Sequence, residues 1–233
     1  PISKLISDVP AVLEVVAFDL DDTLYDEGAY FAAAFEAVSY AVPRPPGVGR
    51  EEVLERIRRI HRTKGRHYHR VFNDLLAELG LEERVHLEPL LAVFRGVRPK
   101  LSLFPGAGEL LAALRPRYRL GLITSGMRAV QENKLRLLGI AGAFERVVFS
   151  GGLPENKPGQ LPFRRLLEAM GVQAERAAYV GDNPHMDFKG ANELGMLTVR
   201  VRNPAFDGAA VPPGHDARVR VAGVAEIRSL FLN

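Results

Sequence analysis

Short runs of apolar and β-branched residues recur along the chain, separated by longer stretches with apolar residues at helical spacing. Runs of four to six such residues are typical of strands, and apolar residues repeating every three to four positions are typical of helices. Five strands are predicted on this basis: Val15–Phe18, 120–124, Arg146–Phe149, 177–180 and Leu197–Val201. Strands that alternate with helices predict βαβ units and a parallel sheet.

The helices between the later strands carry their own stop signals. Gly139 follows one helix and Gly171 follows another, each after the last apolar residue. Glycine ends a helix readily because, without a Cβ atom, it adopts the left-handed conformation at little cost. The apolar positions that define the two helices are Val130, Leu135 and Leu138 in the first, and Phe163, Leu166, Leu167 and Met170 in the second.

The alternation stops between residues 26 and 100, where the pattern fits helices alone. Four helices are predicted from these apolar positions: Phe31, Phe35 and Val38; Val53, Ile57 and Ile60; Val71, Phe72, Leu75, Leu76 and Leu79; Leu87, Leu90, Leu91 and Phe94. The turn-rich segment 43–47 separates the first two, and segment 101–108, with its Pro and Gly, is interpreted as the return linker. We therefore predict an α/β fold in which an all-helical domain, residues 26–100, is inserted into a sheet-containing core of residues 1–25 and 101–233.

Composition narrows the class of protein. The 233 residues contain no cysteine, which excludes disulfides and thiolate chemistry. The sequence pI of about 9.3 reflects a net charge of only +3, which is weak evidence for nucleic-acid binding. No segment approaches the roughly 18 consecutive apolar residues of a membrane span, and residues 1–10 lack the apolar core of a signal peptide. We expect a soluble cytoplasmic protein with no nucleic-acid or membrane partner.

An acidic cluster directly after the first strand is the strongest chemical signal. Asp19, Asp21 and Asp22 lie within four residues, and like charges this close are costly unless a cation or hydrogen-bond donors hold them. Helix capping would explain one of them but not three. A calcium loop is disfavoured because Leu24 stands where an EF-hand loop needs glycine. The cluster favours a carboxylate nucleophile with a carboxyl acid/base beside it and a hard divalent cation.

Two further candidate positions follow the second and third strands. Thr124, Ser125 and Gly126 end the second strand, where hydroxyls and free backbone N–H groups can bind an anion. The alternative is ordinary helix N-capping by Ser125. Lys157 follows the loop 150–154 and could neutralise both carboxylates and a phosphate. The alternative for it is a solvated surface lysine.

A second pair of carboxylates follows the fourth strand. Asp182 and Asp187 bracket a loop that begins with Gly181, where the backbone can approach closely. The loop is rich in oxygen ligands, which suits Mg²⁺ better than Zn²⁺. His185 is interpreted as a loop residue, and the alternative for Asp187 is capping of the helix that follows.

These four segments, each following its own strand, resemble the four motifs of the haloacid dehalogenase-like hydrolase superfamily. The matching segments are 19–23, Thr124, Lys157 and 182–187, in that order. The resemblance covers nearly the whole chain and implies a Rossmann-like, doubly wound parallel sheet core. The helical insertion resembles the cap of the family's type I members, and the motif set resembles that of the phosphatase branch.

The resemblance also implies roles for individual residues. Asp19 would be the nucleophile and Asp21 the general acid/base, with Asp22 left as a structural or capping residue. Thr124, with Ser125 and Gly126, would bind the phosphoryl group, and Lys157 would stabilise both the phosphate and Asp19. Mg²⁺ would be bound by Asp19, the backbone carbonyl of Asp21 and Asp182, supported by Asp187.

One position departs from the family pattern. The proline often found three residues after the motif-three lysine is replaced by Gln160, and Pro162 comes later. The helix after Lys157 is therefore expected to begin differently, with Pro162 in its first turn.

The segment 44–70 is strongly basic, with nine Arg and Lys residues against three Glu. It also contains His61, His67, Tyr68 and His69. Attraction of an anionic substrate such as a nucleotide or sugar phosphate is one interpretation. A solvated helix face with packed arginine stems is the other, and is favoured for most of these residues.

The leading functional hypothesis is a Mg²⁺-dependent phosphomonoester hydrolase acting on a small phosphorylated metabolite through an aspartyl-phosphate, as a monomer or homodimer. A phosphomutase shares the motifs and remains an alternative. A dehalogenase is disfavoured, because Asp21 supplies an acid that the family's dehalogenases usually lack there. A non-catalytic phosphometabolite-binding regulator would have no need of Asp21.

Overall fold

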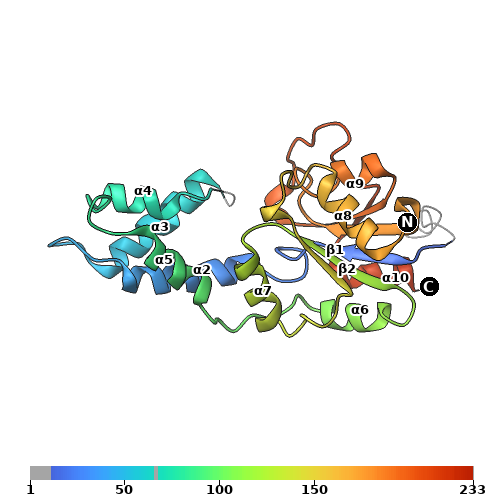
Figure 1. Ribbon diagram of the computed structural model, residues 1–233, viewed down its shortest axis with the longest axis horizontal. Coiled ribbons are helices and arrows are strands. Elements are labelled where there is room, and N and C mark those ends of the chain that lie inside the picture. Colours follow the sequence, from blue (N-terminus) through green and yellow to red (C-terminus); the bar gives the residue numbers. More distant parts are fainter. Residues whose placement is uncertain (1–11, 66–67, 233) are drawn as a thin grey trace. The chain divides into compact units, whose positions relative to one another are not determined.

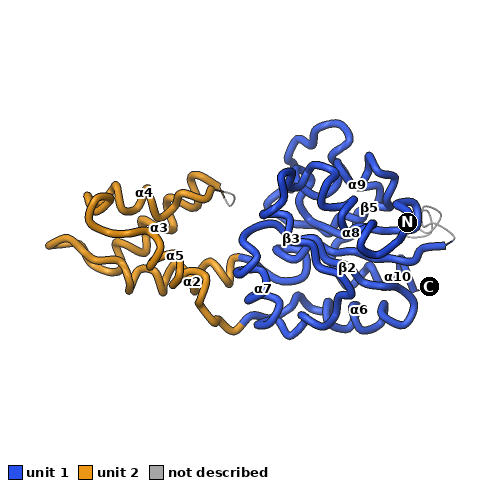
Figure 2. Tube along the Cα trace, in the orientation of Figure 1, with its two compact units in different colours: residues 1–27, 101–233 blue, residues 28–100 orange. Residues whose placement is uncertain are grey.

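The computed structural model describes residues 12–65 and 68–232 and divides the chain into two compact units. The core unit consists of Pro1–Glu27 and Leu101–Asn233, and the helical unit consists of Gly28–Lys100 (Figure 2). The part of the N-terminus assessed above for a signal peptide lies outside the described residues. Within the described ranges, no helix has both the length and the apolar character needed to cross a membrane.

The core unit is built on one six-stranded sheet in which every neighbouring pair is parallel. Its order is β3-β2-β1-β4-β5-β6. The strands are β1 (Val15–Phe18), β2 (Arg119–Thr124), β3 (Arg146–Phe149), β4 (Ala177–Gly181), β5 (Leu197–Val201) and β6 (Val219–Val221). The parallel α/β fold and the five predicted strands are confirmed. The sixth strand was not predicted, because three residues are too few to show a period.

Helices cover both faces of the sheet, which explains why three of its strands are buried along their whole length. Strands β1, β4 and β5 are buried at every position. Helices α8 (Leu161–Met170) and α9 (Lys189–Leu194) pack on one face, while α6 (Ala107–Leu114) and α10 (Ile227–Phe231) lie on the other (Figure 1). Helix α7 (Arg128–Leu137) connects β2 to β3.

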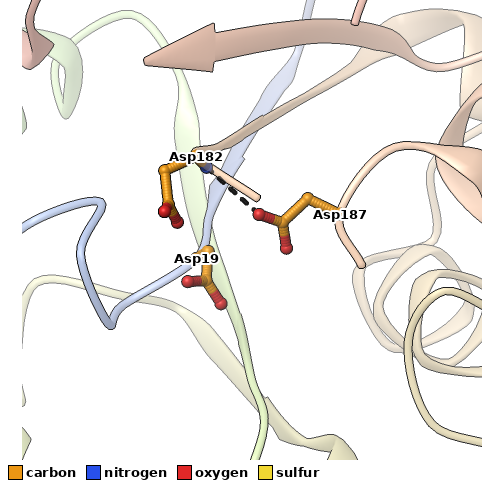
Figure 3. A group of neighbouring side chains, drawn as sticks. All are labelled: Asp19, Asp182 and Asp187. Carbon is orange, nitrogen blue, oxygen red and sulfur yellow. Dashed lines mark hydrogen bonds between the residues drawn. The ribbon is translucent and has the colours of Figure 1, made fainter. Parts of the chain in front are cut away.

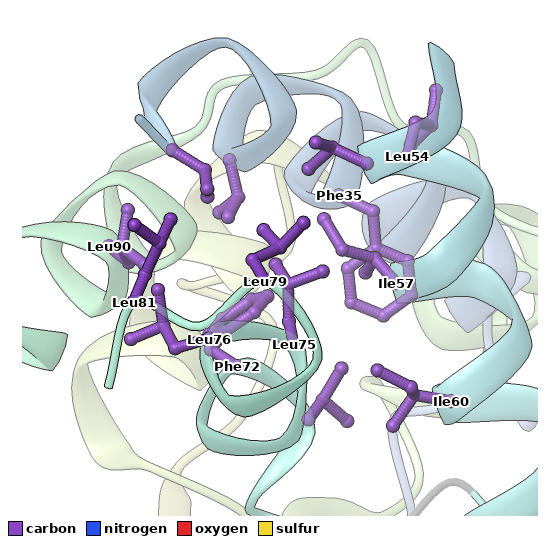
Figure 4. Packing of buried hydrophobic residues seen from close by; sticks show 14 residues of the cluster. Phe35, Leu54, Ile57, Ile60, Phe72, Leu75, Leu76, Leu79, Leu81 and Leu90 are labelled. Carbon is purple, nitrogen blue, oxygen red and sulfur yellow. The ribbon is translucent and has the colours of Figure 1, made fainter. Parts of the chain in front are cut away.

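The helical unit contains α2 (Glu27–Ala41), α3 (Arg50–Lys64), α4 (Val71–Glu78) and α5 (Leu87–Gly96). Their apolar faces meet in a cluster of buried residues of their own (Figure 4). All four predicted helices are therefore confirmed, and the helical segment is inserted between β1 and β2 as expected. The unit has its own hydrophobic core, as an independent domain requires.

Helix ends were predicted less well than helices themselves. The expected return linker 101–108 overlaps α6, which begins at Ala107 directly after Gly106 in the left-handed conformation. Helix α7 begins at Arg128 rather than directly after Ser125, as N-capping by Ser125 would require, so residues 125–127 form a loop. The stop signals at Gly139 and Gly171 are confirmed, and both glycines have positive φ. Short 3₁₀ turns at Ser150–Gly152, Ala174–Arg176, Pro204–Phe206 and Val224–Glu226 complete the unit.

The strand order changes direction at β1. The chain proceeds from β1 to β2 and β3 on one side, then crosses to β4, β5 and β6 on the other. Ligands of open α/β sheets bind outside the carboxyl ends of the strands, at the point where the order reverses. The ends of β1 and β4 are therefore where a site is expected.

Candidate active site

Three predicted carboxylates converge at this edge of the sheet. Asp19 follows β1, while Asp182 and Asp187 follow β4, and one carboxylate oxygen from each lies within 4.8 Å of the other two (Figure 3). The backbone of Asp19 donates to the carbonyl of Val180 at 2.8 Å, which fixes the two strand ends side by side. All three aspartates are at most 6% exposed. Only a cation or several donors can hold three buried carboxylates together.

Gly181 makes room for Asp187. A Cβ atom at Gly181 would lie 2.5 Å from Oδ2 of Asp187, so no other residue fits there without movement. The same oxygen accepts hydrogen bonds from the backbone N–H groups of Asp182, at 3.1 Å, and Asn183, at 2.8 Å. Asp187 therefore organises its own loop, and the alternative that it caps α9 is wrong because that helix has no side-chain cap.

The electrostatics of the cluster favour a bound cation. Burial raises the pKa of Asp19 well above its usual value, although the charge of Lys157 opposes the shift. Burial, with the charge of Asp187, raises the pKa of Asp182 to about 6. Both carboxyls are thus held where ionisation is costly without a compensating positive charge, and a divalent cation would supply it.

Lys157 supplies positive charge on one side of the cluster. Its Nζ atom donates to Oδ1 of Asp19 at 2.6 Å and to Oδ1 of Asp187 at 2.7 Å. The Nζ atom also lies 3.1 Å from the hydroxyl of Tyr179, a buried residue of β4 that no sequence motif marks as functional. The alternative of a solvated lysine is wrong, since Lys157 is only 5% exposed. Pro162 lies in the first turn of α8, as expected.

Thr124 ends β2 at the same edge of the sheet, because Leu122 is in register with Phe18 of β1. It is completely buried, and its Oγ1 atom has no hydrogen-bond partner among the described residues. A buried hydroxyl without a partner is costly and suggests that a ligand satisfies it. Gly126 follows with φ near 104°.

Ser125 does not cap α7 but contacts the loop that follows β3. Helix α7 begins beyond it without a side-chain cap, so the N-cap alternative is wrong. Its Oγ atom lies 3.2 Å from Oγ of Ser150 and donates to Oδ1 of Asn156 at 3.2 Å. The same Asn156 oxygen accepts from the backbone N–H of Lys157 at 2.7 Å. Asn156 therefore ties the loop after β2 to the loop that carries Lys157.

The carboxylate of Asp21 is turned toward α7. Its Oδ1 atom accepts from Nζ of Lys134 at 2.6 Å and from the hydroxyl of Tyr25 at 2.7 Å. Its Oδ2 atom accepts from Nε2 of Gln131 at 3.0 Å. Among the described residues, the group of carboxylates suited to a metal comprises Asp19, Asp182 and Asp187. The carboxylate of Asp21 thus has its own set of donors.

Asp22 is structural, as expected: its Oδ1 accepts from the backbone N–H of Glu27 at the start of α2.

Sequence reasoning missed the buried Lys134. Besides Asp21, it donates to Oε1 of Glu27 at 3.1 Å, and its side chain is only 3% exposed. One signal could have found it: Lys134 follows Val130 by four positions and therefore lies on the apolar face of its helix. A charged residue on a core-facing stripe is rare unless it is paired.

Two further donors at Asp182 were also missed. Thr23 donates to its Oδ1 at 3.0 Å and Asn203, after β5, donates to its Oδ2 at 2.7 Å. These bonds orient both oxygens of the carboxylate. No sequence signal marks Asn203, which is 21 residues away in a loop.

Within the described part of segment 44–70, four of its nine basic residues form ion pairs on the surface of the helical unit. Arginines of α3 form ion pairs with glutamates: Arg50 with Glu36 and Glu51, Arg56 with Glu52, Arg59 with Glu78, and Arg62 with Glu55. Tyr68 donates to Asp74 at 2.7 Å, and His69 is exposed. His61 packs against the rings of Phe31 and Phe35, and burial lowers the pKa of its imidazole. His67 lies outside the described residues.

The fold and the site together indicate an α/β enzyme. Its acidic cluster, the buried Lys157 and the unpaired hydroxyl of Thr124 all lie in segments that follow strands of the sheet. Comparison with known proteins agrees. Residues 13–195 match the family described as haloacid dehalogenase-like hydrolase. The chain therefore belongs to the haloacid dehalogenase-like hydrolases.

Its relatives include several phosphatases. The chain is 34% identical over 194 residues to the glyceraldehyde 3-phosphate phosphatase of Methanocaldococcus jannaschii, covering 82% of this chain and 85% of that protein. It is 30% identical to the phosphoglycolate phosphatase of Neisseria meningitidis, covering 81% and 80%. The crystal structure of a phosphatase from Thermococcus onnurineus shares the fold, with a TM-score of 0.66, 24% identity, and coverage of 94% and 97%.

Proposed function

We propose that this chain is a Mg²⁺-dependent phosphomonoester hydrolase that works through an aspartyl-phosphate on Asp19. The proposal rests on the groups that surround Asp19. One of its oxygens is held by Lys157 at 2.6 Å, inside a buried cluster with Asp182 and Asp187. The buried hydroxyl of Thr124, which lacks a partner among the described residues, lies at the same sheet edge.

In the first half-reaction, a carboxylate oxygen of Asp19 attacks phosphorus and the bond from phosphorus to the ester oxygen breaks. Asp21 gives its proton to the departing oxygen, which leaves as an alcohol. In the second half-reaction, Asp21 takes a proton from water, whose oxygen attacks phosphorus and releases phosphate. Asp19 is then restored, and Asp21 again carries one proton.

Other residues of the site would position and neutralise the phosphoryl group. Thr124 would donate its hydroxyl to a phosphoryl oxygen, with Ser125 and Gly126 lining the same loop. Lys157 would offset the negative charge shared by the phosphoryl group and Asp19. Positioning and neutralisation of this kind supply most of the catalysis in phosphoryl transfer.

The donor set fits magnesium. Asp19 and Asp182 would hold the ion together with the backbone carbonyl of Asp21, and Asp187 would support this shell. When bound, Mg²⁺ would neutralise charge on the phosphoryl oxygens. The raised pKa values of Asp19 and Asp182 are the property expected of ligands that a cation must compensate. All the donors are oxygen atoms, as this hard cation prefers.

The relatives guide the choice of substrates to test. Their names include glyceraldehyde 3-phosphate, phosphoglycolate and phosphoserine phosphatases. Each of these substrates is a two- or three-carbon phosphate monoester that carries a second polar group. We therefore propose a substrate of this size class rather than a nucleotide.

The proposal is tested by phosphate release from an aryl phosphate and from these three metabolites, with Mg²⁺ and with a chelator. We expect Mg²⁺-dependent turnover, and a loss of at least about 10³-fold in Asp19→Asn, because the nucleophile is removed. Mass spectrometry after acid quenching should find a phosphoryl group on the peptide that contains Asp19.

Asp207→Asn is the matched control, because Asp207 is an exposed aspartate paired with Arg202. It should keep wild-type activity. Absence of turnover on every ester would contradict the hydrolase proposal. Undiminished turnover in Asp19→Asn would contradict only the assignment of Asp19 as the nucleophile.

A further inference from the structure

We propose that Lys134, together with Gln131, is a positioning residue that aims the carboxyl group of Asp21 at the leaving group. The inference rests on the proposed function, in which Asp21 moves the protons. It concerns residues of α7 that belong to none of the four motifs.

Two side chains of α7 donate hydrogen bonds to the carboxylate of Asp21. Gln131 and Lys134 are three residues apart on one face of the helix, so both side chains reach the same neighbour. They hold opposite oxygens of the Asp21 carboxylate, Oδ2 at 3.0 Å and Oδ1 at 2.6 Å. Gln131 also donates to the backbone carbonyl of Ser125, in the loop after Thr124. The helix therefore links the acid/base to the proposed phosphate-binding loop.

The hydrogen bonds leave one specific position for the catalytic proton. A carboxylate oxygen has two acceptor positions. Among the described residues, Oδ1 of Asp21 receives two donors, Lys134 and Tyr25, and both positions are taken. Oδ2 receives one donor, Gln131, and keeps one position. Proton transfer is therefore directed to Oδ2 of Asp21.

The burial of Lys134 argues against a purely structural role for this residue. A lysine that is 2% exposed is costly, and a well-packed apolar residue would serve the core at least as well. Its charge is balanced by Asp21 and by Glu27, both residues of the core unit. Glu27 thus compensates a charge whose other partner is the proposed acid/base.

The test compares kcat/KM for an aryl and an alkyl phosphate, since kcat/KM reports the steps through release of the alcohol. An aryl oxide leaves without a proton, whereas an alkoxide needs one. Because acid catalysis contributes about 10² to 10⁴-fold, we expect Lys134→Met to lose about 10 to 100-fold on the alkyl ester and less than about 3-fold on the aryl ester. Asp21→Asn should show the same selectivity with a larger loss.

Three further variants separate positioning from folding. Lys134→Arg keeps the charge and the donors and should recover most of the alkyl activity. Lys134→Met combined with Glu27→Gln restores the charge balance but does not reposition the carboxyl group of Asp21. The loss of kcat/KM on the alkyl ester should therefore persist. Arg136→Met, which removes a charge from an exposed position of the same helix, should behave as wild type.

A double-mutant cycle decides the inference. If Lys134 acts only through Asp21, adding Lys134→Met to Asp21→Asn costs nothing more on either ester. Equal losses on both esters, additive losses in the double variant, or recovery by Glu27→Gln would overturn the inference while leaving the hydrolase intact. If wild type hydrolyses neither ester with Mg²⁺, the proposed function itself fails.

Discussion

Two buried lysines of the core unit, Lys157 and Lys134, make the same kind of contact and yet differ in what surrounds them. Each has a side chain only 3% exposed, and each bridges two carboxylates. Lys157 joins Asp19 and Asp187 at the ends of β1 and β4. Lys134 projects from α7 and joins Asp21 to Glu27 at the start of α2.

The difference lies in what else each pair of carboxylates contacts. The carboxylates at Lys157 belong to a cluster with Asp182, which leaves excess negative charge for a cation. At Lys134, two carboxylates face one ammonium group, and Gln131 and Tyr25 donate further hydrogen bonds to Asp21. We infer that the first arrangement serves the phosphoryl group and the second serves the proton. The three predictions below test this division.

The largest effect is expected from removing Lys157. Lys157→Met should lower kcat/KM by about 10² to 10³-fold, because a preorganised charge at the transition state is lost. The loss should be the same for aryl and alkyl phosphates, in contrast to the selective loss in Lys134→Met. Steady-state kinetics on both esters measure it, with circular dichroism to confirm folding. An alkyl-selective loss in Lys157→Met would end the distinction between the two lysines.

A smaller effect is expected from Mg²⁺ on stability. At 100 times its Kd, the ion should stabilise the fold by about 3 kcal/mol and raise Tm by about 5 to 10 °C. The rise should be larger at pH 7.5 than at pH 5.5, because binding needs ionised carboxylates and the pKa of Asp182 is about 6. Thermal unfolding with and without chelator measures it.

Two variants assign this stabilisation to one cluster. Asp182→Asn should abolish the Mg²⁺-dependent rise, whereas Glu27→Gln, at the other lysine, should retain it. A rise that survives Asp182→Asn would show that the ion binds elsewhere.

The smallest effect concerns Glu27 and pH. Burial, with the negative charge of Asp21, raises the pKa of Glu27 from 4.5 to about 7, although Lys134 opposes the shift. The folded state therefore binds this proton more tightly than the unfolded state does. Its contribution to stability is present below pH 4.5 and is lost as the pH rises to 7, by about 2 kcal/mol for a carboxyl that retains some contact with water.

Denaturant unfolding in chelator, across pH 4.5 to 7.5, measures this contribution. Glu27→Gln should flatten the decline relative to wild type. Glu145→Gln is a suitable control, because the pair with Arg119 lowers the pKa of Glu145 and its contribution has the opposite sign. A decline of unchanged slope in Glu27→Gln would assign the pH dependence to other groups.

Much of the fold could be read from the sequence. The five longer strands and the four helices of the inserted unit were predicted, because their apolar periods are long enough to be distinctive. Strand β6 and the starts of α6 and α7 were not, since short strands and helix ends depend on tertiary contacts. The resemblance implied that Asp19, Asp182 and Asp187 share one site, and their positions after β1 and β4 agree with it, because parallel strands bring their carboxyl ends to one edge.

What only the tertiary structure decided is the partner of each charged group. The sequence placed Asp19 and Asp21 two residues apart, and nothing in their spacing indicated that one would face Lys157 and the other Lys134. Strand periodicity and chain order determine where a residue emerges from the sheet. The partner of its side chain depends on helices far away in sequence, packed at an angle that no local pattern encodes.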